Sequence, residues 1–420
     1  MFNPEKIKER FDHLSTLKLQ LNMTRGKPSP EQLDLSLPLL DLVGSDDYIA
    51  ADGTDCRNYG VLDGLPEAKE LFAEFLEVET TEVIIGGNSS LALMHDVIQH
   101  LLLHGCSGEK PWVQQSPKFI CPSPGYDRHF NICEHHKIEM ITVDNLQNGP
   151  DMDKVEELVG HDASIKGIWI VPKYGNPTGA ICSEEVVQRL ASMKTAAPDF
   201  RIFWDNAYTV HHIDDGSQVL TDILEYCRKA GNPNRVLIFG STSKITFAGA
   251  GVAMMGGSET NMNWLRDHMA MQTIGSDKLN QLRHIRFFPS VEDIYAHMKK
   301  HAAILRPKFN LVLSTLEKEL GGKEVASWTN PSGGYFISLN TADGLAKRVV
   351  ELASQAGVKL TGAGASFPYK NDPRDRNIRI APSLPALEDL EIATEILCLS
   401  IQLAYFEKYP EKVKLSQSTV

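Results

Sequence analysis

Lys244 is the residue of this chain whose surroundings best suit a nucleophilic amine. It follows an apolar run at 237–239 and a serine-rich turn, and a run of small residues at 248–251 comes after it. Burial between such segments favours the neutral amine, which can attack a carbonyl carbon and form a Schiff base. A lone lysine is more often a solvated surface charge, so this prediction depends on the polar residues that accompany Lys244.

Other polar groups stand at the ends of predicted strands. Asn176 follows the strand predicted at 167–171, and Asp205 follows the one at 201–204. Ligands of open α/β sheets bind in the crevice outside the carboxyl ends of the strands, so these side chains are expected to meet Lys244 there. Taken singly, Asp205 also suits a helix N-cap, and Asn176 suits a plain turn.

Four motifs in this order resemble the class I aminotransferases of fold type I, which use pyridoxal 5′-phosphate (PLP). They are Asn-Pro-Thr-Gly at 176–179, Asp-x-x-Tyr at 205–208, Ser-x-x-Lys at 241–244 and Arg-Ile-Ala-Pro-Ser at 379–383. The resemblance extends from about Arg25 to the C-terminal helix. It implies an enzyme that moves an amino group between an amino acid and a 2-keto acid.

The resemblance also implies a role for each matching residue. Lys244 would hold PLP as a Schiff base and then, as the free amine, move the proton at the substrate Cα. Asp205 would keep the pyridine nitrogen protonated, so that the ring accepts electrons. Asn176 and Tyr208 would donate to the phenolic oxygen of the ring, and Tyr126 would stack on it. Core packing is the other reading of Tyr126.

The PLP phosphate is expected at the start of the helix predicted from Ser90. Exposed amides and the helix dipole favour an anion there, and Asn88 and Ser89 lead into this helix. The resemblance adds Ser241 as a hydroxyl donor and Tyr59 as a tyrosine contributed across a dimer interface. It therefore implies a homodimer with shared active sites.

One position departs from the family pattern. Many members carry an arginine eight residues after the lysine, where it binds the phosphate, but this chain has Val252. Either the amides and hydroxyls at the helix start suffice, or a cation from elsewhere replaces the arginine.

The substrate is expected to bind through Arg379, because a planar guanidinium can hold both oxygens of an α-carboxylate. A surface salt bridge is the other reading of Arg379. The segment 24–30, with Arg25 and Gly26, resembles the substrate-side loop of a divergent aspartate aminotransferase subgroup, and Asn176 would also face the substrate. This implies aspartate with 2-oxoglutarate. A dicarboxylic substrate needs a second cation, and the candidates are Arg25, Lys27, Arg57, Arg283 and Arg286.

Two other functions fit the same motifs. A β-lyase or decarboxylase could use the same scaffold, since a fold does not fix a reaction. A non-enzymatic PLP-binding sensor, like the aminotransferase-like domain of some transcription regulators, is less favoured because such regulators carry a DNA-binding domain ahead of this fold.

Strands and helices alternate between about residues 80 and 260. Apolar runs rich in β-branched residues predict strands at 82–85, 118–121, 139–143, 167–171, 201–204, 235–239 and 252–255. Helical spacing predicts helices at 66–78, 90–103, 153–159 and 183–193. The fold class is predicted as α/β: a seven-stranded, mostly parallel sheet flanked by helices, as in fold type I enzymes.

The pattern changes beyond residue 290 to that of a smaller α+β domain. It predicts a long helix at 291–320, strands at 334–339 and 377–381, and helices at 342–356 and 386–406. We expect a large PLP-binding domain over 55–300 and a small domain formed by 1–54 and 301–420.

Composition excludes several classes of protein. The chain has 420 residues, 42% of them hydrophobic and 23% charged, and no apolar run long enough for a membrane span. A net charge of −12 argues against nucleic-acid binding. Seven cysteines without a CxxC pair and an N-terminus without an export signal predict a cytoplasmic protein. No metal is expected, because the adjacent histidines at 135–136 and 211–212 lack a ligand spacing.

Overall fold

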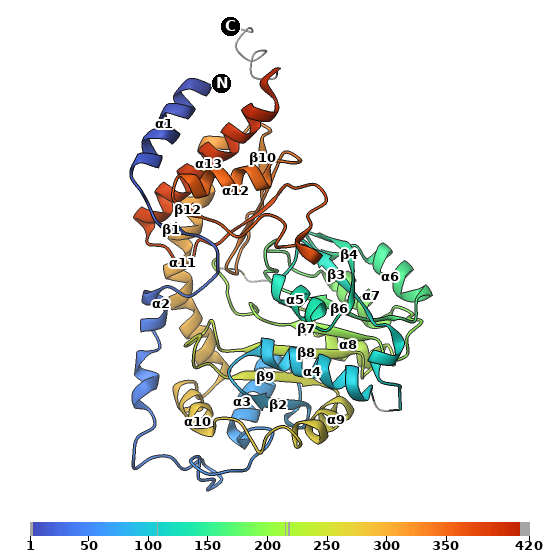
Figure 1. The fold of residues 1–420 in the computed structure, drawn as a ribbon. Coiled ribbons are helices and arrows are strands. Elements are labelled where there is room, and N and C mark those ends of the chain that lie inside the picture. The colour runs from blue at the N-terminus through green and yellow to red at the C-terminus, as the bar shows by residue number, and fades with distance from the viewer. Residues whose placement is uncertain (1–2, 107, 215, 217–218, 412–420) are drawn as a thin grey trace.

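An eight-stranded sheet organises the larger part of the molecule (Figure 1). The computed structural model describes residues 3–106, 108–214, 216 and 219–411. In spatial order the strands are β2 (Val83–Gly86), β9 (Ala253–Gly257), β8 (Val236–Ser241), β7 (Arg201–Asp205), β6 (Ile165–Ile170), β3 (Lys118–Ser123), β4 (Glu139–Leu146) and β5 (Gly149–Pro150).

The centre of this sheet is parallel and its two edges are antiparallel. All strand pairs from β8 through β7, β6 and β3 to β4 are parallel, whereas β9 is antiparallel to both β2 and β8. The seven predicted strands are confirmed. The sequence did not predict β5, which pairs with β4, because two residues are too short to show a hydrophobic period.

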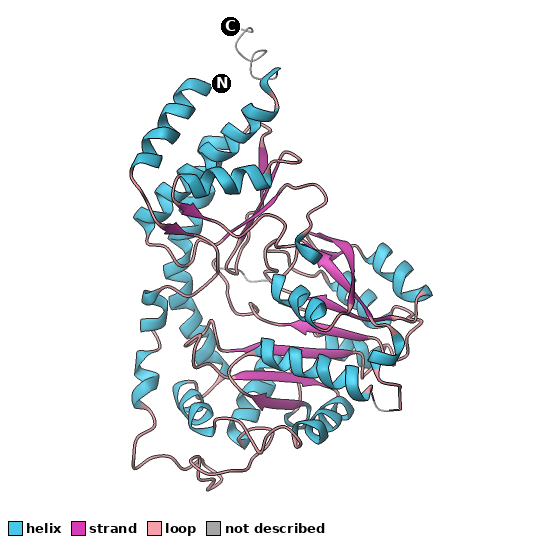
Figure 2. Ribbon diagram, viewed as in Figure 1, coloured by secondary structure: helices cyan, strands magenta, loops and turns pink. Residues whose placement is uncertain are grey.

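Helices cover both faces of the sheet (Figure 2). Along β7, Ile202 and Trp204 belong to one hydrophobic core and Phe203 belongs to the other, as the alternation of side chains on a strand requires. The first core takes side chains from α3 (Pro66–Leu76), α6 (Met152–His161), α7 (Glu184–Ser192), α8 (Ile223–Lys229) and α10 (Lys278–Phe287). The second takes them from α4 (Ser90–His104), α5 (Asp127–His135) and α9 (Glu259–Met269).

The remaining elements surround a third core at the other end of the molecule (Figure 1). Its antiparallel sheet has the order β10 (Ala326–Trp328), β11 (Ile337–Thr341), β13 (Asn377–Ile380), and β1 (Leu21–Asn22) pairs in parallel with β12 (Val358–Lys359). The helices here are α1 (Pro4–Thr16), α12 (Ala346–Gln355) and α13 (Leu387–Lys408), and the short α2 (Pro30–Asp34) packs on α11 (Val291–Leu320). β11 begins three residues later than predicted, because Gly334 has φ +85, which is not extended backbone.

The helix α11 joins the two parts. Val291, Ile294 and Met298 pack into the core of the large sheet, whereas Leu305 and Phe309 pack into the third core. Its bounds agree with the predicted helix at 291–320. The domain boundaries at 54/55 and 300/301 stay a prediction.

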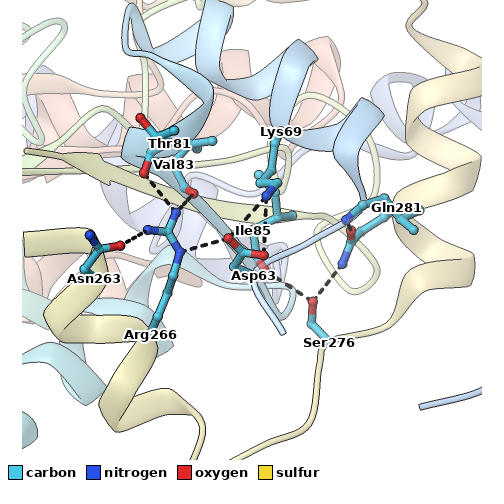
Figure 3. A network of polar contacts seen from close by, with 10 residues as sticks. Asp63, Lys69, Thr81, Val83, Ile85, Asn263, Arg266, Ser276 and Gln281 are labelled. Carbon is cyan, nitrogen blue, oxygen red and sulfur yellow. Dashed lines mark hydrogen bonds and ion pairs between the residues drawn. The ribbon is translucent and has the colours of Figure 1, made fainter. Parts of the chain in front are cut away.

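A polar network fixes the chain just before β2 (Figure 3). Arg266 on α9 donates to Asp63 Oδ2 at 2.9 Å and to the carbonyl oxygens of Thr81 and Val83. Lys69 forms a second ion pair with Asp63, at 3.3 Å. The network thus ties α3, α9 and β2 together, and it holds the segment that follows the loop of Tyr59.

No helix in the described part of the chain is both long and apolar enough to cross a membrane.

Candidate active site

Three adjacent parallel strands carry the predicted catalytic residues. Asn176 follows β6, Asp205 ends β7, and Lys244 follows β8. Because these strands are neighbours in the sheet, their carboxyl ends bring the three residues to one edge. The Lys244 Nζ lies 4.7 Å from the centre of the Tyr208 ring, so the structure brings these two predicted residues together.

Asp205 is held by a residue that the sequence did not single out. His129 Nε2 lies 2.9 Å from Asp205 Oδ2, and both side chains are only 2% exposed. The other carboxylate oxygen, Oδ1, is buried and has no hydrogen-bond partner among the described residues. His129 is itself fixed by stacking on Trp169, with ring centres 4.4 Å apart. Asp205 therefore keeps one buried acceptor oxygen for a ligand.

Tyr208 and Tyr126 lie near Asp205 as protonated phenols. Burial and the carboxylate of Asp205 raise the pKa of Tyr208, although a hydrogen bond with Asn176 partly opposes this. Burial raises the pKa of Tyr126 to about 12. The ring centres of Tyr126 and His129 lie 4.9 Å apart, with the two planes inclined at 77°. Both hydroxyls can donate hydrogen bonds at neutral pH.

Arg379 reaches this group from β13 in the other part of the molecule. Its Nη1 donates to Asp127 Oδ1 at 2.8 Å and to Asn176 Oδ1 at 3.3 Å, and its Nη2 donates to Thr361 Oγ1 at 3.4 Å. Its Nε is buried without a partner in the described part of the chain. The sequence did not predict Asp127 or Thr361, because no local pattern links them to Arg379.

The predicted substrate-side loop lies close to Arg379. Thr361 donates to the Thr24 carbonyl at 2.6 Å, and the Phe336 ring lies 5.0 Å from the Arg379 Cζ. A Cβ on Gly26 would lie 2.7 Å from Phe336. Only glycine therefore lets this loop pack so closely here, and it carries the exposed side chain of Arg25.

The residues predicted to bind the phosphate form a second group beside Lys244. Ser89 is the N-cap of α4, and its side chain makes no capping hydrogen bond. Ser243 donates to the Asn88 carbonyl at 3.2 Å, so the start of α4 lies against the turn between Ser241 and Lys244. Gly87, with φ +44, turns the chain from β2 into this segment.

The side chain of Val252 offers no polar group to this second group. Its side chain is 1% exposed and packs in the core of the large sheet. Gly251, the residue before it, accepts a hydrogen bond from Asn280 at 2.8 Å, and Arg283 donates to Asn280 at 3.0 Å. The Arg283 Nε is buried and lacks a partner among the residues that the structure describes.

Within a single chain, Tyr59 does not join the other predicted site residues. Its side chain is 84% exposed. Two of the cations considered for the distal carboxylate are already paired: Arg57 with Asp55 at 2.8 Å, and Arg286 with Asp47 at 2.6 Å.

The fold and these side chains define a PLP-dependent aminotransferase of fold type I. Residues 4–412 match the family model described as aspartate amino-transferase, and the chain belongs to this family. It is 49% identical over 407 residues to an aspartate aminotransferase of Corynebacterium glutamicum, covering 96% of this chain and 94% of that protein.

Solved structures agree with this assignment. The crystal structure of an aspartate transaminase from Corynebacterium glutamicum has a TM-score of 0.94 with this chain at 49% identity, covering 97% of this chain and 96% of that one. The α-aminoadipate aminotransferase of Thermus thermophilus, complexed with N-(5′-phosphopyridoxyl)-L-leucine, shares the fold at 21% identity, with a TM-score of 0.76 over 96% and 97% of the two chains. The predicted fold class, enzyme class and cofactor are confirmed.

Proposed function

We propose that this aminotransferase takes aspartate as amino donor and 2-oxoglutarate as acceptor, as a cytoplasmic homodimer with shared active sites. The observation that carries the proposal is the buried guanidinium of Arg379, joined through Asn176 to Tyr208 and held close to the edge that bears Lys244. The activity named for the Corynebacterium glutamicum relative supports aspartate. Seven free, buried cysteines are in keeping with a reducing compartment.

The side chains present fit PLP. The buried Asp205 Oδ1 lacks a donor in the described part of the chain, and a protonated ring nitrogen would supply one. The uncapped start of α4 offers amides to a phosphate. When bound, PLP supplies a conjugated ring that takes up the electron pair left on the substrate Cα.

Lys244 would hold the cofactor covalently and carry the proton. Once the substrate amine has taken its place, the free Lys244 amine accepts the proton from the substrate Cα and later returns one. The Tyr208 ring, 4.7 Å away, stabilises the ammonium form by a cation–π contact.

Asp205 and His129 would act as one unit on the ring nitrogen. His129 Nε2 is hydrogen-bonded to Asp205 Oδ2 at 2.9 Å. This bond fixes the rotation of the carboxylate and would direct Oδ1 to the ligand. Asn176 and Tyr208 would donate to the phenolic oxygen of the ring. Asp205 and His129 would thus favour a protonated ring nitrogen, and Asn176 and Tyr208 would stabilise the phenolate.

The phosphate would be held by Asn88, Ser89, Ser90 and Ser241. Arg283 would supply the positive charge that Val252 cannot, because Asn280 joins Arg283 to the turn at Gly251. The Arg283 Nε is buried without a partner among the described residues, and an anion is the partner that its charge favours.

Arg379 would bind the α-carboxylate of the substrate, and Arg25 the distal one. The Arg25 loop is anchored close to Arg379 by Gly26 against Phe336, whereas Arg57 and Arg286 are paired elsewhere. An exposed arginine beside the carboxylate anchor suits the second carboxylate of a dicarboxylic substrate.

The homodimer is supported by the surface around Tyr59. Tyr59, Met271 and Ile274 are 84%, 86% and 60% exposed. The segment of Met271 and Ile274 adjoins the Tyr59 loop, because a Cβ on Gly275 would lie 2.5 Å from the Gly60 carbonyl oxygen. An aromatic ring and two apolar side chains so exposed favour burial against a second chain.

The absorption spectrum of the purified protein, before and after aspartate is added without a keto acid, tests the proposal. We expect a visible cofactor band that bleaches to the pyridoxamine form, and a Lys244→Ala variant with neither the band nor the bleaching. Continued release of keto acid without an acceptor would indicate a lyase. A Lys244→Ala variant with full turnover would contradict the proposal.

A further inference from the structure

Three histidines on two helices meet on the face of the sheet that α4 and α9 cover. His100 and His104 lie one turn apart on α4, and His268 lies near the end of α9. The nitrogens that each can offer to a metal all lie within 4.8 Å of one another. The His268 ring is stacked with both others, at 4.5 Å from His104 and 5.1 Å from His100.

One nitrogen of this group is buried without a partner among the described residues, and the surroundings of two of the three imidazoles favour the neutral form. Burial and the neighbouring imidazoles lower the pKa of His100 and of His268. The His100 Nε2 is buried and has no hydrogen-bond partner among the residues described. Neutral imidazole is the form that coordinates a metal, and a buried nitrogen without a partner costs free energy that a metal bond would recover.

From this arrangement we infer a binding site for one divalent transition-metal ion, Zn²⁺ above all, formed by His100, His104 and His268. Three imidazoles suit Zn²⁺, which binds nitrogen at about 2.0–2.1 Å and accepts a water as fourth ligand. Tetrahedral coordination places the nitrogens about 3.4 Å apart. Metal binding would therefore require the side chains to rotate out of their present stack until their nitrogens converge, and the exposed His104 leaves room for the water.

The ion would have a structural role, cross-linking two helices. It would tie α9, which the Arg266 network anchors to the start of β2, to the C-terminal part of α4. The N-terminal end of the same helix carries Ser89 and Ser90. An ion that binds only the folded chain stabilises it by mass action. The bound ion would thus stabilise α4, which begins at the proposed phosphate site, without contacting the reacting atoms.

A second group of histidines provides an internal control. His95, His135 and His136 also come within 4.8 Å of one another. However, His135 and His136 are adjacent in sequence, so their side chains leave the backbone in different directions. We therefore place the ion at the first group, where His100 and His104 lie one turn apart on one helix face and can both turn toward a common ion.

Titration of the metal-free holoenzyme with Zn²⁺ by calorimetry, and with Co²⁺ by visible absorption, tests the site. Trp264 gives a third signal, since its ring lies 4.5 Å from that of His268. We expect one ion per chain, quenching of Trp264 fluorescence by Co²⁺, and a higher Tm with Zn²⁺.

The variants His268→Ala and His104→Ala should each weaken binding at least about tenfold, since even outer contacts of a metal site are worth that much. His104 is exposed, so its loss does not endanger folding. The matched control His135→Ala should bind as the parent does. Absence of binding at stoichiometric Zn²⁺, or affinity lost in His135→Ala but kept in His268→Ala, would overturn the inference.

Discussion

His129 Nε2 lies 2.9 Å from Asp205 Oδ2, while Asp205 Oδ1 has no partner in the described part of the chain. The stack of His129 on Trp169 fixes the imidazole, and the imidazole fixes the carboxylate. The acceptor oxygen proposed for the cofactor is therefore aimed by a residue from a different element, α5.

Replacing His129 with alanine should lower kcat by about 10- to 100-fold, because a hydrogen bond to a charged group is worth about 1.5–3 kcal/mol. The visible cofactor band should remain, with an altered pH titration, since Lys244 is intact. His135→Ala, on the same helix but exposed, is the matched control. Unchanged kinetics and pH titration in His129→Ala would show that His129 only fills space.

Arg379→Lys should raise KM for aspartate by about 10- to 100-fold, because lysine cannot replace both arms of a guanidinium that binds a carboxylate. Arg374→Lys is the control, since Arg374 pairs with Asp343 at a half-exposed site. Steady-state kinetics with aspartate and with 2-oxoglutarate would detect the change. An equal KM in both variants would contradict the assigned role.

Mixing two inactive variants tests whether Tyr59 acts across a dimer. Tyr59→Phe and Lys244→Ala homodimers should each have low activity. Hybrid dimers should regain one intact site, because the Lys244→Ala chain still supplies Tyr59 to its neighbour. Activity should therefore rise when the unfolded variants are refolded together. No rise despite hybrid formation would place Tyr59 outside the partner's site.

Stability should fall as pH drops from about 6.5 toward 4. Burial lowers the pKa of His284, His297 and His301 to about 4. The unfolded chain therefore takes up protons in this window that the folded chain excludes, and each histidine costs about 1 kcal/mol at pH 5.5. Urea unfolding at pH 7.5 and 5.5 would measure this. His297→Gln should reduce the difference, whereas exposed His13→Gln should not.

The sequence by itself determined the class of chemistry and most of the elements. Lys244, Asp205 and Asn176 follow strands whose continuous apolar runs mark them as buried, and the helix at 291–320 shows the period of an amphipathic helix. Such signals are local, because propensity and periodicity act over a few residues. The alternation of strands and helices predicted a parallel sheet, whose strands all end at the same edge, and this was enough to expect these three side chains there.

The tertiary structure alone decided which residues support them. His129 meets Asp205, Asp127 meets Arg379, and His268 meets His100 only because the sheet and its covering helices bring distant segments together. Each of these contacts depends on packing between elements far apart in sequence. Hydrophobic periodicity reports only on a few neighbouring residues and therefore cannot predict such packing. The proposed role of Tyr59 depends on a second chain as well. Its side chain is exposed in the single chain, so only the association of two chains would bring it to an active site.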